Sequence, residues 1–158
     1  SGVRRFDRDV LAQPGVTHAI VMLGTNDLRN RHALPGEEVT AERMIAGLKQ
    51  MAVRAQTRGI KLIVATLTPF GNETFLPGAW NPVREGHRIA VNAWIRDNGS
   101  PDGSPDGMLD GVADFDAALR DPERPTQMLP DLDCGDGLHP SDLGYCKMGD
   151  AIDLALLD

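Results

Sequence analysis

The amino-acid sequence predicts an α/β fold with three layers, in which a parallel β-sheet lies between two layers of helices. Three short and largely apolar runs, at residues 17–23, 60–66 and 112–115, have the length of β-strands. Such runs are typical of parallel strands that helices cover on both faces. Segments with helical spacing of apolar residues separate them, as a parallel sheet requires. The length of 158 residues suits a single domain over residues 1–158.

The first half of the chain contains one strand between two helices. Helical spacing predicts a helix over residues 3–12, which a Pro-Gly pair ends. The apolar run at 17–23 predicts a buried strand. Thr40 can cap a second helix, which continues to about residue 58. The apolar face of this helix consists of Met44, Ile45, Leu48, Met51 and Ala52.

The second half repeats this alternation. A second buried strand is expected at residues 60–66. Asn81, followed by a proline, can cap a helix over 82–97, because proline is favoured at the first helical position. Residues 112–115 predict a third, shorter strand, and Ser141 can cap a last helix that runs to about residue 157.

Composition excludes two classes of partner. The formal net charge of −7 leaves no basic cluster that could neutralise nucleic-acid phosphates, so we expect no nucleic-acid partner. A membrane-spanning helix needs about 20 consecutive apolar residues. The sequence contains no such stretch, and we expect no membrane partner.

A polar motif follows the first strand directly. It consists of Gly24, Thr25, Asn26 and Asp27. A side-chain amide at the carboxyl end of a parallel strand is well placed to donate a hydrogen bond to an oxyanion. Taken alone, the Asn-Asp pair could equally form a turn that closes the strand.

A second motif precedes the last helix. Asp136 lies three residues before His139, and a carboxylate in this position can orient an imidazole that acts as a general base. Taken alone, the two residues could be a loop carboxylate and a half-buried histidine. We expect no catalytic role for His18, His32 or His87.

Together these motifs resemble the third and fifth sequence blocks of the SGNH (GDSL-type) hydrolases. Residues 6–11, 112–119 and 144–145 also resemble a secreted bacterial branch of that family often linked to carbohydrate esterases. The resemblance implies a flavodoxin-like sheet of order 2-1-3-4-5, of which the three runs are the last three strands. It implies a Ser-His-Asp ester hydrolase that needs no cofactor or metal, with a short-chain acyl or polysaccharide ester as substrate.

The resemblance also assigns roles to residues. Asn26 corresponds to an oxyanion-hole donor, and Asp136 and His139 correspond to two members of the triad. Gly24, Thr25 and Asp27 are candidate substrate-binding neighbours. The same resemblance implies a secreted or periplasmic location.

The nucleophilic serine has no counterpart in this sequence. Ser1, Ser100, Ser104 and Ser141 are the only serines, and none lies in the family's first block, while the second block is also without a counterpart. We therefore expect an N-terminally truncated hydrolase whose serine lies on another segment. The alternative is a non-catalytic domain that binds acylated sugars or a protein partner.

The implied strand order leaves one edge of the first strand unpaired. An apolar strand edge invites association with another chain. We therefore expect residues 17–23 to be covered by a companion N-terminal fragment, by a swapped partner or homo-oligomer, or by an adapted N-terminus.

Two loops carry further candidates. The loop at 67–80 contains Phe70, Phe75 and Trp80, which could form an acyl or sugar platform or simply pack the loop onto the core. The Asp-Gly pairs within residues 98–110 do not match a calcium-loop template and indicate successive turns. Arg29 and Arg31 are interpreted as solvated loop charges, with contact to an anionic or sugar substrate as the alternative.

Two cysteines flank the second motif. Cys134 and Cys146 could form a disulfide that closes this loop, or remain free thiols, and spacing alone does not decide between these. A zinc site is not favoured, because His139 and two cysteines lack a fourth ligand and a Cys-x-x-Cys pair.

Overall fold

The structure is a computed structural model, and it describes residues 1–29, 33, 34, 36–99 and 107–158. Its centre is a parallel sheet of three strands in the order β1-β2-β3, formed by His18–Val21, Lys61–Ala65 and Gly111–Ala113. His18 lies opposite Lys61, and Ile63 lies opposite Gly111. The predicted α/β fold with a parallel sheet is confirmed, and the predicted strand positions hold to within a few residues.

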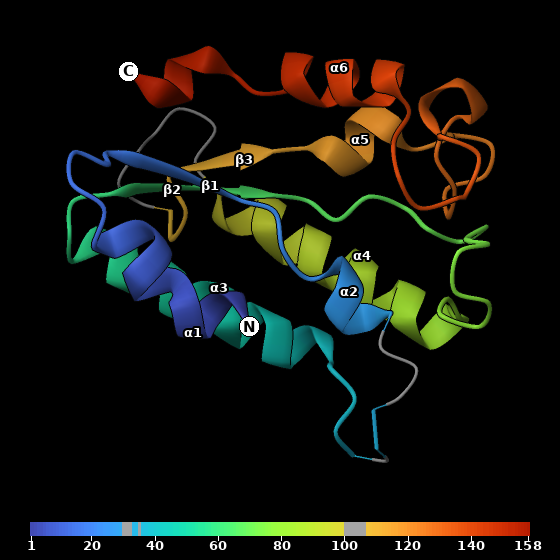
Figure 1. Ribbon diagram of the computed structural model, residues 1–158, viewed down its shortest axis with the longest axis horizontal. Coiled ribbons are helices and arrows are strands. Elements are labelled where there is room, and N and C mark those ends of the chain that lie inside the picture. The colour runs from blue at the N-terminus through green and yellow to red at the C-terminus, as the bar shows by residue number, and fades with distance from the viewer. Residues whose placement is uncertain (30–32, 35, 100–106) are drawn as a thin grey trace.

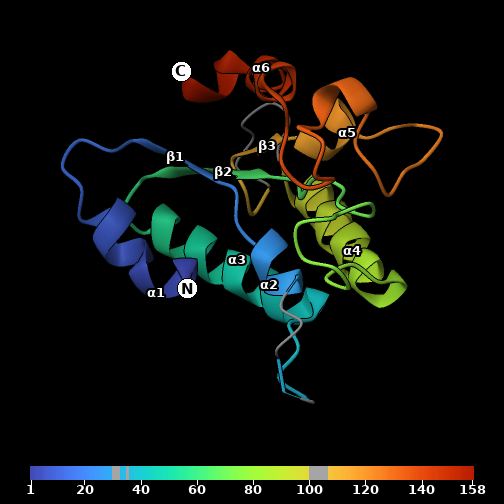
Figure 2. The same ribbon diagram turned by 45° about the vertical axis from the view of Figure 1, so that its right-hand side comes forward.

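Helices lie on both sides of this sheet. In Figures 1 and 2, α1, α2, α3 and α4 occupy one side, and α5 and α6 occupy the other. The α-helices are α1 (Gly2–Phe6), α2 (Thr25–Leu28), α3 (Ala41–Gln56), α4 (Pro82–Asn98), α5 (Phe115–Leu119) and α6 (Asp142–Asp150). A π-helix, η1 (Asp7–Leu11), continues α1, and two 3-10 helices are η2 (Pro130–Leu132) and η3 (Leu154–Leu157).

The three predicted capping residues begin their helices. The side-chain oxygens of Thr40, Asn81 and Ser141 accept hydrogen bonds from backbone N–H groups three residues further on, at 3.4, 2.9 and 3.2 Å. A cap of this kind satisfies a donor that the first helical turn leaves without a partner. The sequence signals for these three helix starts were therefore correct.

Two predicted boundaries were wrong. The third strand was expected to include residue 115, but it ends at Ala113, and Asp114 caps α5 through a 3.1 Å hydrogen bond from the Ala117 N–H. The last helix was expected to run to about residue 157, but α6 ends at Asp150 and a separate turn, η3, follows. Local capping by Asp114 and Asp153 outweighs the continuous apolar pattern at these sites.

The central strand is buried on both faces. Leu62 and Val64 belong to the core cluster formed with α3 and α4, whereas Ile63 and Ala65 belong to the cluster formed with α5 and α6. Side chains alternate between the two faces of a strand, so each core takes every second residue of β2. This double burial explains the uninterrupted apolar run in the sequence.

One edge of the sheet is open in the chain taken alone. β1 pairs with β2, and no other described segment pairs with its far edge. Ile20, Met22 and Leu23 are 43, 40 and 42% exposed. The described residues of this chain therefore do not provide the cover expected for residues 17–23. None of the helices in the described part of the chain is long and apolar enough to cross a membrane.

Some expectations fall on residues outside the described part of the chain. These are Arg31, His32, Ser100 and Ser104, together with the Asp-Gly turns within 100–106. Near the end of that loop, the Asp110 carboxylate accepts a 2.7 Å hydrogen bond from the N–H of Leu62 at the start of β2.

Buried polar side chains of α4 anchor the chain where it leaves β2. The Asn92 side chain accepts a 2.7 Å hydrogen bond from the Leu67 N–H and donates a 2.8 Å hydrogen bond to the Leu67 carbonyl. Arg88 donates a further hydrogen bond of 2.9 Å to the same carbonyl. Asn92 is therefore the only partner shown for the Leu67 N–H among the described residues.

Replacing Asn92 should destabilise the fold strongly. We expect Asn92→Ala to lower the free energy of unfolding by about 2–4 kcal/mol, because it leaves the buried Leu67 N–H without a partner and opens a small cavity. The matched control is Asn98→Ala at the end of the same helix, for which we expect a loss below about 1 kcal/mol. Urea unfolding followed by circular dichroism measures both. Equal losses for the two variants would contradict the assigned role of Asn92.

Candidate active site

The first predicted motif forms a tight turn at the carboxyl end of β1. Gly24 has a φ of 130°, in the region that only glycine adopts readily, and a Cβ at this position would lie 2.3 Å from Met44 Cε. The turn starts α2, which carries Asn26 and Asp27 with both residues exposed. The motif therefore presents its polar side chains at the edge of the sheet where ligands bind in such folds.

Arg29 fixes the orientation of the Asn26 side chain. The Arg29 Nη1 group donates a 2.6 Å hydrogen bond to Asn26 Oδ1. Arg29 also donates from Nε to Glu73 Oε2 at 2.7 Å and from Nη2 to Glu73 Oε1. The Arg29 and Glu73 side chains are only 7 and 1% exposed. The interpretation of Arg29 as a solvated loop charge was wrong, because the guanidinium is buried and paired.

The second predicted motif lies in a loop that its own hydrogen bonds hold in place. Asp133 Oδ1 accepts hydrogen bonds of 2.8 and 3.0 Å from the N–H groups of Gly135 and Gly137. Gly137 has a φ of 72°, and a Cβ there would lie 2.3 Å from the Asn72 carbonyl oxygen. Glycine at this position lets the motif approach the loop that follows β2.

Asp136 and His139 form the expected pair. His139 Nδ1 lies 2.6 Å from Asp136 Oδ2, while Asp136 Oδ1 accepts hydrogen bonds from the N–H groups of Leu138 and His139 at 2.9 and 2.8 Å. The carboxylate favours the tautomer with the proton on Nδ1. The His139 side chain is 52% exposed.

Hydrogen bonds keep Asp136 ionised. Burial by itself raises the pKa of the Asp136 carboxyl. The hydrogen bonds from the His139 imidazole, the two backbone N–H groups and the Cys134 thiol outweigh this effect and hold the pKa well below its usual range. Asp136 is therefore a carboxylate that orients the imidazole over the whole physiological pH range.

The loop after β2 connects the two motifs. The Thr74 N–H donates a 2.8 Å hydrogen bond to the Asp136 carbonyl, and Glu73 in the same loop pairs with Arg29. The Phe75 ring lies edge-on to the His139 imidazole, with 6.1 Å between the ring centroids and an interplanar angle of 86°. The strands run toward the right in Figure 1, and α2 and this loop lie beyond their carboxyl ends.

The three aromatic residues of this loop differ in their exposure. Phe70, predicted to contact substrate, is 0% exposed and packs in the core cluster of α3 and α4, so its ring is not open to a ligand. Trp80 packs against the same cluster and donates to Glu85 Oε2 at 3.3 Å. Phe75 is 70% exposed beside His139. Of the proposed platform, only Phe75 is presented at the site.

The two cysteines are not joined. Cys134 and Cys146 are both exposed and free, so the disulfide is absent. Cys134 lies in the loop, where its thiol hydrogen-bonds Asp136, whereas Cys146 is on α6. Potential metal-ligand atoms of Cys134, Asp136 and His139 lie within 4.8 Å of one another.

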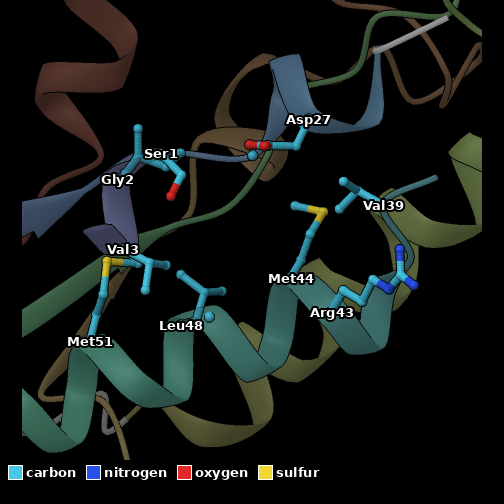
Figure 3. A pocket seen from close by; sticks show the side chains of 12 residues that line it. Ser1, Gly2, Val3, Asp27, Val39, Arg43, Met44, Leu48 and Met51 are labelled. Atoms are coloured by element: carbon cyan, nitrogen blue, oxygen red, sulfur yellow. The ribbon is translucent and has the colours of Figure 1, made fainter. Parts of the chain in front are cut away.

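A cavity of about 220 Å³ lies beside the first motif (Figure 3). Met44, Leu48 and Met51 project into it from α3, and Val3 lies opposite them on α1. Gly24 and Asp27 also line this cavity, whereas Thr25 and His139 do not. The cavity is therefore a feature of the β1 side of the molecule, distinct from the His-Asp pair.

Neither described serine is placed as a nucleophile. Ser141 Oγ caps α6 and donates to the Asp131 carbonyl at 2.8 Å, and Ser1 lines the cavity beside Gly24. Neither is hydrogen-bonded to His139.

A match to a protein-family model shows the family of this chain. The model of the GDSL-like lipase/acylhydrolase family matches residues 1–146, most of the chain. The chain belongs to this family.

Solved structures agree with the family membership. A GDSL-like lipase from Bacteroides thetaiotaomicron matches with a TM-score of 0.73 and 18% identity, over 98% of this chain and 68% of that one. An acetylxylan esterase from Geobacillus stearothermophilus matches with a TM-score of 0.65 and 18% identity, over 98% of this chain and 65% of that one. The fold is therefore that of the SGNH hydrolases, and this chain spans about two thirds of the length of these structures. No curated protein matches the sequence.

The sequence analysis missed the role of Glu73. This residue pairs with Arg29 across 44 positions of sequence, and no local pattern indicates such a pair. The sequence offered only one signal for such a pair, which was an arginine two positions after the Asn-Asp motif.

The lowered pKa of Asp136 predicts a pH-dependent contribution to stability. A carboxylate whose pKa is lower in the folded chain contributes stability above its unfolded pKa of about 3.9, and this contribution is lost as the pH falls through the folded pKa. The unfolding free energies of wild type and Asp136→Asn should therefore differ by a constant amount above about pH 5, and this difference should narrow steadily as the pH falls below about 4. Urea titrations at each pH measure the difference. A difference that stays constant down to pH 2 would refute the assignment.

Proposed function

We propose that this chain carries the base and the oxyanion donor of an SGNH-type ester hydrolase, whose nucleophilic serine lies on a segment outside this chain. The observation that carries the proposal is the 2.6 Å contact between His139 Nδ1 and Asp136 Oδ2, in a histidine whose side chain is half exposed. An oriented imidazole next to a carboxylate is the arrangement that activates a hydroxyl nucleophile. Family membership supports the same reaction class.

The proposed reaction uses each group at a defined step. The serine Oγ attacks the ester carbonyl carbon while His139 Nε2 takes the hydroxyl proton, and Asp136 stabilises the resulting imidazolium. The Asn26 Nδ2 amide donates to the carbonyl oxygen as it gains negative charge. His139 returns the proton to the leaving alcohol, and the acyl-enzyme forms. Water then attacks the acyl-enzyme by the same proton transfers in reverse.

The surface beside β1 supports the proposal that another segment packs there. Leu23, two residues after the end of β1, is 42% exposed and also lines the apolar cavity next to Gly24, while Ile20 within β1 is 43% exposed. A strand that lies along β1 would cover both features at once and would end beside Asn26. The proposed occupant is the companion N-terminal segment that bears the serine, with a homo-oligomer as the alternative.

The substrate proposed is a short-chain acyl ester on a carbohydrate. The exposed Phe75 ring beside His139 offers an apolar surface of the kind that contacts sugar rings or acyl groups. The matched structure from Geobacillus stearothermophilus is described as an acetylxylan esterase, which supports an acetylated polysaccharide. A polysaccharide substrate agrees with the secreted or periplasmic location proposed for the protein.

A non-catalytic role is the second candidate. Of the serines that the structure describes, Ser141 is a helix cap and Ser1 lies at the cavity, and neither is hydrogen-bonded to His139. A domain of this kind would bind acylated sugars or a protein partner through the same site. Activity measurements on the chain and on the product of the complete reading frame separate the two candidates.

The isolated chain should be inactive. We expect it to hydrolyse a short-chain aryl ester no faster than buffer, because neither serine in the described part of the chain is hydrogen-bonded to His139. The product of the complete reading frame, assayed in parallel, should turn over the same ester. Burst-phase formation of an acyl-enzyme on the isolated chain would show that it contains its own nucleophile. Inactivity of both proteins would favour the non-catalytic candidate.

In the product of the complete reading frame, here called the active protein, Asn26→Ala should lower kcat by about 10²–10³. This is the usual effect of removing one oxyanion donor. Asn98→Ala, which removes an amide far from the motif, should leave kcat unchanged. Steady-state kinetics with an aryl acetate measure both. A loss of less than about threefold in Asn26→Ala would show that Asn26 only closes the turn.

A further inference from the structure

The Asn26 side chain can act as a donor only if its amide points the right way. An asparagine amide has one acceptor and two donor positions, and rotation by half a turn exchanges them. Arg29 Nη1 lies 2.6 Å from the side-chain oxygen of Asn26. An arginine has donors only, so the flipped amide would place two donor groups against each other. Arg29 therefore holds Oδ1 and leaves Nδ2, on an exposed residue, available to donate to another group.

The position of Arg29 is itself fixed. Its Nε and Nη2 groups both donate to the carboxylate of Glu73, and Glu73 Oε1 also accepts a 3.0 Å hydrogen bond from the Leu76 N–H. Both side chains are almost wholly buried. A guanidinium held by two parallel hydrogen bonds cannot rotate without breaking both.

Stability alone is a poor explanation for this pair. A buried ion pair is often no more stable than apolar residues of the same size, because both charges lose their hydration. The Arg29–Glu73 pair instead fixes the relative positions of the groups that it contacts. Glu73 lies between Asn72, whose carbonyl contacts Gly137, and Thr74, whose N–H donates to the Asp136 carbonyl. The pair therefore links the oxyanion donor to the loop that holds the His-Asp pair.

We propose that Arg29, held by Glu73, is a positioning residue that presents the Asn26 amide as an oxyanion donor at a fixed place relative to His139. The proposal rests on the ester hydrolase function proposed above. Arg29 itself touches no reacting atom, and it acts through Asn26.

The test replaces Arg29 and Glu73 together. Substituting Arg29 alone would leave the buried Glu73 carboxylate without a partner and could unfold the protein. The variant is therefore the double substitution Arg29→Met and Glu73→Gln, which keeps side-chain volume and removes both charges. The matched control is Arg54→Met with Asp7→Asn, a second pair in which one arginine donates twice to one carboxylate, between α3 and η1.

Kinetic measurements with Asn26 present and with Asn26→Ala distinguish a positioning role from a general disturbance of the fold. In the active protein, we expect the double variant to lower kcat by about 10-fold or more with KM changed less than about twofold, since the oxyanion contact exists only in the transition state. In an Asn26→Ala background, the same substitutions should lower kcat by less than about twofold. The control substitutions, Arg54→Met with Asp7→Asn, should leave kcat unchanged in both backgrounds. An equal loss in the two backgrounds, or no loss in either, would overturn the proposal.

A second readout needs no activity. In ¹⁵N spectra of this chain, the Asn26 side-chain amide is identified by its loss in Asn26→Ala. We expect its two protons to be resolved in wild type and in the control, and to move to the positions of a free amide in Arg29→Met/Glu73→Gln. Unmoved signals would overturn the positioning role. A protein without ester turnover whose Asn26 signals still move would refute the proposed function and leave the positioning role intact.

Discussion

The structure depends on the burial of β2 and of the residues that follow it. Leu62 to Leu67 are almost wholly inaccessible to solvent, so each polar backbone group in this stretch needs a partner within the protein. The sheet supplies partners up to Ala65, and Asn92 and Arg88 of α4 supply them at Leu67. Without those side chains the loop at 67–80 could not leave the sheet through the core, and the two halves of the site would not be linked.

The same buried region contains an unusual concentration of charge. Arg88 lies between Glu85 and Asp116, and Asp116 also accepts from Arg96 and Arg120. Burial by itself lowers the pKa of Arg88, but the two carboxylates outweigh it and raise the pKa. Such a network adds little stability relative to apolar packing. Its directional contacts instead fix how α4 and α5 meet across the carboxyl end of the sheet.

The sequence predicted what short-range patterns determine. Apolar runs located the three strands, capping residues located three helix starts, and the spacing of Asp136 and His139 predicted their contact. Contacts between residues far apart in the sequence are not indicated by any short-range pattern. Phe70 and Phe75 occupy the same loop, and only the packing of the folded chain buries the first and exposes the second. The boundary at Asp114 depends on a local cap that competes with an apolar run.

The two halves of the site are ordered by different means. The loop of Asp136 and His139 is held mainly by its own short-range hydrogen bonds. Asp133 accepts from the N–H groups of Gly135 and Gly137, and Asp136 accepts from those of Leu138 and His139. Asn26 has only a short helix of its own and obtains its orientation from Arg29 and Glu73. Neither arrangement involves a serine. The His-Asp pair and the Asn26 side chain are therefore each held in place by contacts within this chain, and under the proposed function a nucleophile that docks beside β1 would meet groups that are already oriented.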